Sequence, residues 1–162
     1  MKFQRFDTSQ VTELMAWFTD SDQLRTWGGP EFRFPFTAAT FREDAKVDSI
    51  DSFSLVSEGG SLAAFGQCYL RVGRCHFGRV GVSPRWRGQG HGTRLFREMA
   101  GWGRAEFGPR ELSLFVNKTN TEAHRLYLRL GFREMPYPEA IPPGMDAHYM
   151  VAPRLLDSAA AR

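Results

Sequence analysis

The sequence has little cysteine and no long apolar run, and both shortages narrow the possible classes of protein. Cys68 and Cys75 are its two cysteines, and they flank a predicted hairpin turn near Val72-Gly73. Neither has the spacing with a second pair that a metal site needs, so we interpret both as buried thiols. No stretch approaches the ~20 apolar residues of a membrane helix, and residues 1–10 carry charges instead of the apolar run of a signal peptide. We therefore expect a cytoplasmic protein with reduced thiols, no membrane partner and no metal.

The net positive charge is small, but arginines are concentrated locally. The net charge of +3 gives composition alone no basis for a nucleic-acid or membrane partner. Arginines gather between positions 71 and 97, and their planar donor forks suit phosphate oxygens. A ligand with several phosphates explains this group, and a solvated arginine-rich face is the alternative. The group consists of Arg71, Arg74, Arg79, Arg85, Arg87, Arg94 and Arg97.

The hydrophobic pattern predicts one mixed α/β (α+β) domain over residues 1–162, with a loose tail at about 157–162. A short strand and helices come first, three strands joined by tight turns follow, and strands and helices then alternate. Helices are predicted at about 8–18, 20–25, 37–46, 90–107 and 122–130. Strands are predicted at about 1–6, 53–57, 62–72, 75–82, 111–116 and 148–151.

A glycine-rich loop, Arg87-Gly88-Gln89-Gly90-His91-Gly92, follows an apolar strand and opens the longest predicted helix. Glycines let backbone N–H groups approach an anion closely, and the helix N-terminus adds partial positive charge. We therefore expect the loop to hold phosphates, with Arg87 and Arg94 adding charge at its edges. A plain connection from strand to helix is the alternative interpretation.

Two nucleotide-binding motifs fit this loop poorly. A P-loop ends in Gly-Lys-Ser/Thr, but Gly92 precedes Thr93 with no lysine between them. A dinucleotide fingerprint needs a glycine three positions after Gly90, where Thr93 lies, and it belongs to an early βαβ unit. The loop follows an antiparallel meander instead.

The loop resembles motif A of the GNAT superfamily of acyl-CoA N-acyltransferases. That motif has Arg/Gln-x-x-Gly-x-Gly/Ala after a strand that ends in Val-x-Pro. It is met here by Val82-Ser83-Pro84 and by Arg87, Gly90 and Gly92. A second family signature is met at Asn120, Ala123, Tyr127, Gly131 and Phe132.

The resemblance implies a GNAT-like fold, with a mixed, mostly antiparallel sheet of about six to seven strands flanked by helices. It also implies an N-acetyltransferase that moves the acetyl group of acetyl-CoA to a primary amine by direct attack in a ternary complex. The acceptor is a small-molecule amine or a peptide or protein amine, and the protein is a monomer or homodimer. The implied cofactor-binding residues are Val80, Gly81, Val82, Arg87, Gly88, Gln89, Gly90, His91, Gly92, Thr93 and Asn120. Gly81 suits the bulge that the family has near the end of this strand.

Tyr127 is the predicted general acid. Asn120, Ala123 and Tyr127 are spaced to share one helix face, which leaves room for pantetheine beside the small alanine. The alternative makes Asn120 an N-cap and Tyr127 a core aromatic. His76 is the predicted base, because it lies six residues before Val82, where many family members have a glutamate; a structural strand histidine is the alternative.

The acceptor pocket is predicted to involve Trp27, Phe32 and Tyr137, although an aromatic core under a loop also explains the first two. An acyl-CoA-binding regulatory domain without turnover is a rival function, and the presence of Tyr127 counts against it. A nucleic-acid-binding module is a further rival, but its basic residues should spread over a face with interleaved aromatics.

Overall fold

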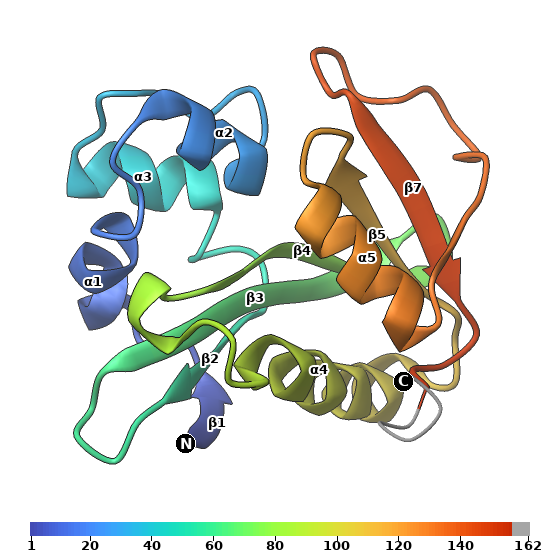
Figure 1. Cartoon of the computed structure of the whole chain (residues 1–162), viewed down its shortest axis with the longest axis horizontal. Helices are drawn as coiled ribbons and strands as arrows, with labels where there is room; N and C mark the ends of the chain where they lie inside the picture. The colour runs from blue at the N-terminus through green and yellow to red at the C-terminus, as the bar shows by residue number, and fades with distance from the viewer. Residues whose placement is uncertain (157–162) are drawn as a thin grey trace. The chain divides into compact units, whose positions relative to one another are not determined.

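The computed structural model describes residues 1–156, and its secondary structure confirms the mixed α/β class. The predicted tail at about 157–162 lies outside the described residues. The helices are α1 (Val11–Met15), α2 (Ser21–Gly28), α3 (Ala38–Ala45), α4 (His91–Phe107) and α5 (Thr121–Leu130), with 3-10 turns at η1 (Thr8–Gln10) and η2 (Pro84–Trp86). The strands are β1 (Lys2–Arg5), β2 (Ser52–Val56), β3 (Leu62–Arg71), β4 (Arg74–Val82), β5 (Leu112–Asn117), β6 (Arg133–Glu134) and β7 (Ala147–Ala152) (Figure 1).

The strands form one seven-stranded sheet in the order β1-β2-β3-β4-β5-β7-β6. The pairs β1–β2, β2–β3, β5–β7 and β6–β7 are antiparallel, whereas β4 and β5 run parallel. The expected mostly antiparallel sheet of six to seven strands is therefore confirmed. Parallel neighbours need a long crossover, and α4 supplies it between β4 and β5.

Short polar side chains begin the helices where the sequence places them. Asp20 accepts a hydrogen bond from the Gln23 backbone at the start of α2, and Thr37 forms a reciprocal capping box with Thr40 at the start of α3. The first predicted helix was too long. Asp7, not Thr8 or Ser9, caps the segment, which begins as a 3-10 turn and ends at Met15.

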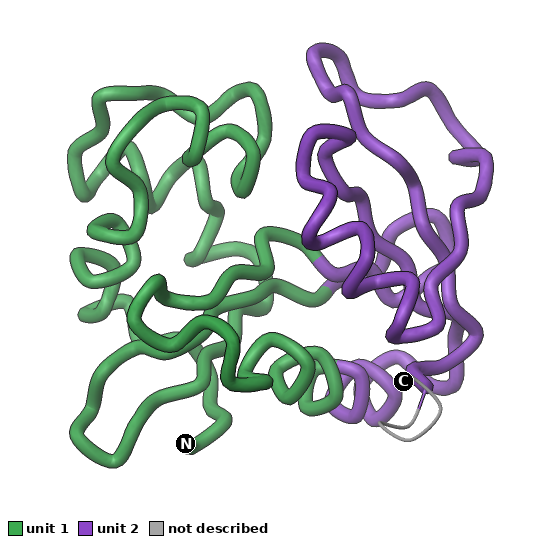
Figure 2. Tube along the Cα trace, in the orientation of Figure 1, with its two compact units in different colours: residues 1–68, 78–99 green, residues 69–77, 100–162 purple. Residues whose placement is uncertain are grey.

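The chain divides into two compact units (Figure 2). The first unit contains residues 1–68 and 78–99, and the second contains residues 69–77 and the described residues from 100 on. The boundaries between the units fall inside β3, β4 and α4, so each of these elements has residues in both units.

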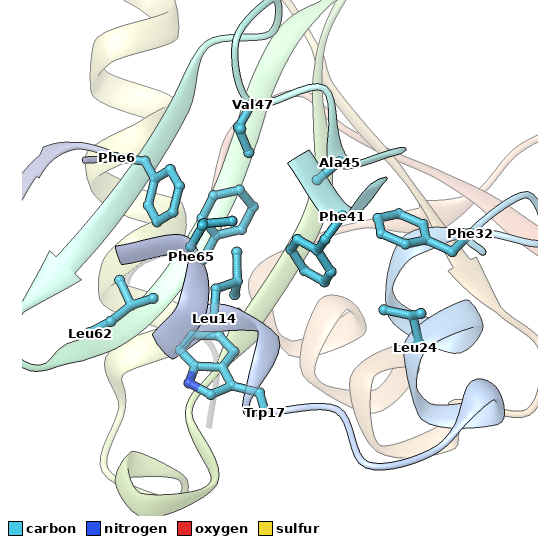
Figure 3. Packing of buried hydrophobic residues seen from close by; sticks show 11 residues of the cluster. Phe6, Leu14, Trp17, Leu24, Phe32, Phe41, Ala45, Val47, Leu62 and Phe65 are labelled. Atoms are coloured by element: carbon cyan, nitrogen blue, oxygen red, sulfur yellow. The ribbon is translucent and has the colours of Figure 1, made fainter. Parts of the chain in front are cut away.

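Aromatic side chains dominate the core of the first unit (Figure 3). Phe41 and Phe65 are completely buried, and Phe32 is 2% exposed. The ring of Phe41 contacts that of Phe32 edge to face, at 5.6 Å between centroids. Phe32, in the loop between α2 and α3, thus points into the core, and α2 contacts the C-terminal part of β4 through Trp27 and Gly28.

The second unit is built around β5 and α5. Leu112, Leu114 and Val116 of β5 are buried, as are Tyr127 and Leu130 of α5.

Within the described residues no helix is long and apolar enough to cross a membrane. Cys68 and Cys75 are both buried, as predicted.

Candidate active site

The glycine loop lies in the first unit, between η2 and the first turn of α4. Gly88 and Gly90 have φ angles of 72° and 81°, in the left-handed region that favours glycine. Nothing lies within 4 Å of a Cβ placed at either position, so backbone conformation accounts for both glycines. The Arg94 amide makes the first helical hydrogen bond to the Gly90 carbonyl, at 3.0 Å, so the amides before it in the first turn have no partner within the helix. This geometry fits the predicted anion site.

His91 and Trp86 form the apolar side of this loop. Their rings meet edge to face, with centroids 5.8 Å apart. Nε2 of His91 is buried and has no hydrogen-bond partner among the described residues. Such nitrogens are rare in folded proteins, so this one marks a place where a ligand atom can complete the bonding.

The arginines that cluster in the sequence do not share one anion site. Arg71 and Arg74 belong to the second unit, where they donate to Tyr137 and Glu111. In the first unit, Arg94 donates to the Met1 carbonyl at 2.9 Å. Arg87 is exposed beside the loop and donates to the Val82 carbonyl at 3.2 Å. Arg87 is therefore the arginine of the group that best fits a role at the edge of a phosphate site.

β4 is irregular at Arg79, two residues before the glycine expected to bulge. Arg79 has φ of 49°, whereas Gly81 does not have a positive φ. The Arg79 side chain stays within the first unit, donating to the Gly28 carbonyl at 3.2 Å and to the Gln67 side chain at 2.9 Å. These bonds hold a backbone conformation that is costly for a residue with a side chain.

Gly81 has a different reason to be glycine. A Cβ there would lie 3.0 Å from Nε1 of Trp27 and 3.2 Å from its Cδ1. Gly81 therefore lets the Trp27 indole approach β4 closely. A residue predicted to bind the cofactor, Gly81, is thus in contact with a residue predicted to bind the acceptor, Trp27.

The two predicted acceptor residues of the first unit differ in environment. Trp27 is half-buried and packs on Phe18, Phe41 and Phe65. Its Nε1 is buried without a hydrogen-bond partner among the described residues. Phe32 is a core side chain, as the alternative interpretation has it. Of the two, Trp27 alone retains a polar atom to offer a ligand.

Asn120 and Tyr127 lie in the second unit, at the start and near the end of α5. The Asn120 side-chain oxygen accepts from the Ala123 amide at 3.3 Å, so Asn120 is an N-cap. Its amide nitrogen can donate to a ligand at the same time. Tyr127 is 9% exposed, and burial raises the pKa of its phenol to about 12. The phenol therefore keeps its proton at neutral pH.

His76 is buried in the second unit and is 2% exposed. Its Nδ1 lies 2.9 Å from Ser113 Oγ, and its ring packs on those of Tyr69 and Phe115. Burial, with a smaller contribution from the Arg71 charge, lowers the pKa of His76 to about 3. Since such an imidazole is neutral but very weakly basic near neutral pH, its environment favours the structural alternative over the predicted base.

Tyr137 borders a pocket of about 380 Å³ in the second unit. Its hydroxyl accepts a hydrogen bond from Arg71 Nε at 2.9 Å, and its ring packs on Phe115 and Tyr149. Glu134 and His148 also line this pocket. Tyr137 is thus the predicted acceptor residue that the structure places at a cavity.

One cluster of the second unit was missed from the sequence. His124, Glu134 and His148 bring their ring nitrogens and carboxylate oxygens within 4.8 Å of one another. The residues come from α5, β6 and β7, and the two-residue β6 was not predicted. A strand that short has no hydrophobic alternation to reveal it, so the position of Glu134 could not be inferred.

Solved structures with the same fold include N-acetyltransferases. The ribosomal-protein-S18-alanine N-acetyltransferase from Escherichia coli is 21% identical, with a TM-score of 0.63, over 97% of this chain and 96% of that one. The PaiA N-acetyltransferase from Thermoplasma acidophilum in complex with coenzyme A is 15% identical, with a TM-score of 0.65, over 93% and 97%. A chimaeric spermidine N-acetyltransferase from Vibrio cholerae and hSSAT is 13% identical, with a TM-score of 0.66, over 93% of each chain. Identities this low show a shared fold.

No curated protein sequence matches the chain. The family comparison is decisive instead, because the acetyltransferase (GNAT) family matches residues 13–132, which include β4, the glycine loop and α5. The chain therefore belongs to the acetyltransferase (GNAT) family.

Proposed function

We propose that this chain transfers the acetyl group of acetyl-CoA to a primary amine by direct attack in a ternary complex. Family membership supports acyl transfer from a CoA thioester. The finer proposal rests on the local geometry of two elements, the glycine loop before α4 and the Asn120–Tyr127 helix α5. The observation that carries it is the buried phenol of Tyr127, which remains protonated on a helix capped by an amide side chain.

The glycine loop binds the pyrophosphate of the cofactor in this proposal. Backbone amides from Gly88 to Gly92 donate to the phosphate oxygens, and the N-terminus of the seventeen-residue α4 adds partial positive charge. Arg87 contributes from the edge, and the unpaired Nε2 of His91 accepts or donates one further bond. Gln89 and Thr93 complete the loop through their backbones.

We assign the pantetheine arm two sets of contacts, each described within its own unit: backbone groups at the end of β4 and the side chain of Asn120. Backbone groups of Val80, Gly81 and Val82 bond the arm and the thioester carbonyl, where negative charge develops as the amine attacks. The amide nitrogen of Asn120 donates to the same arm while its oxygen caps α5.

Tyr127 assists departure of the thiolate. Free thiols titrate near a pKa of about 8.5. The phenol, with its pKa of about 12, is a weaker acid than the thiol that forms, so it acts mainly by donating a hydrogen bond to the developing thiolate. The proton lost by the attacking nitrogen is the one that the sulfur finally carries. We leave His76 out of this proton path because it is buried and weakly basic.

Trp27 of the first unit and Tyr137 of the second are the acceptor contacts that we propose, each on its own environment. Structural relatives are named for acting on an alanine of a ribosomal protein and on spermidine, so both a peptide amine and a small polyamine belong among the substrates tested. Phe32 packs on Trp27 from the core, and we assign it a supporting role.

The test follows release of free thiol from acetyl-CoA with a panel of amines that includes polyamines, amino acids and peptides. Tyr127→Phe should lower kcat by about 100-fold, as expected when a hydrogen bond to charge that develops in the transition state is lost, and leave acetyl-CoA affinity unchanged. Tyr69→Phe removes a phenol hydroxyl elsewhere in the second unit and should leave kcat near that of the wild type.

Two outcomes contradict the proposal. Unchanged turnover in Tyr127→Phe removes the role of the phenol. Binding of acetyl-CoA without thiol release on any amine favours the rival function, an acyl-CoA-binding regulatory domain.

A further inference from the structure

Two histidine rings in the second unit converge on a single carboxylate. His124 Nε2 lies 2.7 Å from Glu134 Oε1, and His148 Nδ1 lies 3.7 Å from Glu134 Oε2. The two imidazole rings are 5.1 Å apart between centroids. The three side chains are 25%, 51% and 31% exposed for His124, Glu134 and His148, so the cluster is partly shielded yet open to ions from solvent.

Local structure explains why the three meet. α5 ends at Gly131, where the chain reverses and the Phe132 amide bonds back to the Tyr127 carbonyl at 3.0 Å. The reversal leads into β6, so Glu134 lies beside the helix that carries His124.

Strand register brings in the third residue. Glu134 pairs with Met150 of β7 in antiparallel register, and His148 lies two residues from Met150 on the same strand. Residues two apart share a face, so Glu134 and His148 are diagonal neighbours on one side of the sheet.

A simple ion pair accounts for only part of this arrangement. The short contact between His124 and Glu134 is an ordinary hydrogen bond. His148 Nδ1, at 3.7 Å, is too far from the carboxylate for one, yet its ring packs beside the ring of His124. A shared ligand at the centre of the cluster would give both imidazoles a role.

We propose that His124, Glu134 and His148 bind one divalent transition-metal ion of the zinc type. Two imidazole nitrogens and a carboxylate oxygen are ligands that Zn²⁺ and Co²⁺ accept, whereas Mg²⁺ and Ca²⁺ prefer oxygen alone. Zinc bonds near 2.0–2.1 Å put tetrahedral ligand atoms about 3.3 Å apart. The separations of 2.7 Å, 3.7 Å and at most 4.8 Å bracket that value, so side-chain rotations suffice.

The fourth position of such a site borders a cavity. Glu134 and His148 both line the pocket of about 380 Å³ that Tyr137 shares. A tetrahedral ion with three protein ligands keeps one position for water or an anionic group. The ion therefore adds a site for a carboxylate or similar anion at the edge of this pocket.

This proposal departs from the sequence-based expectation of no metal, which rested on cysteine spacing. The three ligands come from separate elements and have no recognisable spacing along the chain. The proposal is independent of acetyl transfer, since ion binding is measured without acetyl-CoA.

The test measures binding of Zn²⁺ and of Co²⁺ to tag-free protein by titration calorimetry and visible absorption. We expect one ion per chain, a four-coordinate Co²⁺ spectrum, and weaker binding at pH 5.5 than at pH 7.5, because protonated imidazole cannot bind a metal. His148→Ala and Glu134→Gln should each weaken binding by about 100-fold or more, a larger loss than removal of an outer-shell partner causes.

Matched controls separate this site from general surface binding. His91→Gln removes a histidine of the first unit, and Glu139→Gln removes an exposed carboxylate of the loop between β6 and β7. Both should bind the ion as the wild type does. Thermal unfolding covers the case of a misfolded variant: Zn²⁺ should raise the Tm of the wild type and of both controls but not that of a ligand variant that unfolds cooperatively.

Three results overturn the proposal. The first is that the wild type neither binds the ion at about 0.1 mM free ion nor shows a shift in Tm. The second is equal affinity in the wild type and the ligand variants. The third is an equal loss of affinity in the ligand variants and the control variants.

Discussion

His76 should make the protein less stable in mild acid, and the size of the effect follows from its burial. In an unfolded chain its imidazole titrates at a pKa of about 6.5. In the folded protein, burial lowers the pKa to about 3. Between these values the unfolded chain binds a proton that the folded chain refuses. The stabilisation from a neutral, buried His76 is therefore complete above about pH 6.5 and is lost as the pH falls toward 3.

The magnitude at pH 5 depends little on how low the folded pKa lies. The unfolded chain gains about 2 kcal/mol from protonation at pH 5, and the folded chain gains almost nothing as long as its pKa stays below about 4. Lowering the pH from 8 to 5 should therefore cost about 2 kcal/mol of unfolding free energy through His76 alone.

Urea denaturation at pH 8 and pH 5 measures this effect when the wild type is compared with His76→Gln. Glutamine is neutral at both pH values and can bond Ser113 Oγ in place of the imidazole. All other titrating groups are common to both proteins, so their effects cancel. The wild type should lose about 2 kcal/mol more than the variant between the two pH values.

Equal losses in the two proteins refute the reasoning, because they mean that His76 titrates alike in the folded and unfolded states. The kinetics supply a second check. If His76→Gln abolishes the acid limb of kcat/KM against pH, then His76 is the base after all and its buried, neutral state is not the functional one.

Three backbone predictions follow from φ angles and close approaches. Gly90→Ala should weaken acetyl-CoA binding at least tenfold, as measured by calorimetry, and lower the unfolding free energy by about 1–2 kcal/mol, because alanine disfavours a φ of 81°. The control Gly101→Ala, in α4, should stabilise the protein to urea by up to about 1 kcal/mol. Lys46→Gly should raise the stability to urea by about 0.5–1 kcal/mol, since Lys46 ends α3 with φ of 53°; a loss of stability contradicts the strain. Gly81→Ala should cost about 1–3 kcal/mol through overpacking on Trp27, and a smaller partner, as in Trp27→Leu, should relieve that cost in a double-mutant cycle.

The secondary structure was predictable where periodicity and caps agree. Thr37 and Asn120 begin helices in the structure as the sequence indicates, and Gly131 ends α5. Apolar spacing predicted a first helix that continues to about Phe18, which is longer than the observed one. The backbone amides of Trp17 and Phe18 instead donate to carbonyls only three residues back. Those bonds tighten the chain into turns. The spacing of apolar residues does not indicate whether an amide bonds to the third or to the fourth residue before it.

The features of the candidate site that depend on backbone conformation were predictable from the sequence. Those that depend on the burial of a side chain were less so. The positive φ angles of Gly88 and Gly90 fit a loop inferred from glycine spacing and strand-to-helix position. The environment of His76 could not be inferred, because a histidine within a strand is buried or exposed according to which helices cover the sheet. The meeting of His124 with His148 depends on β6, a strand too short to leave a pattern.

Glycine shows why a residue type alone does not identify a physical role. At Gly88 and Gly90 the left-handed backbone excludes a side chain although space is open, and at Gly81 the backbone is permissive while the indole of Trp27 occupies the space. The two causes respond differently to a second mutation, because backbone strain persists whatever the neighbours are, whereas a steric clash is relieved by shrinking the neighbour. A rescue of Gly81→Ala by Trp27→Leu, without any rescue of Gly90→Ala, would therefore distinguish backbone strain in the glycine loop from steric contact between Trp27 and β4.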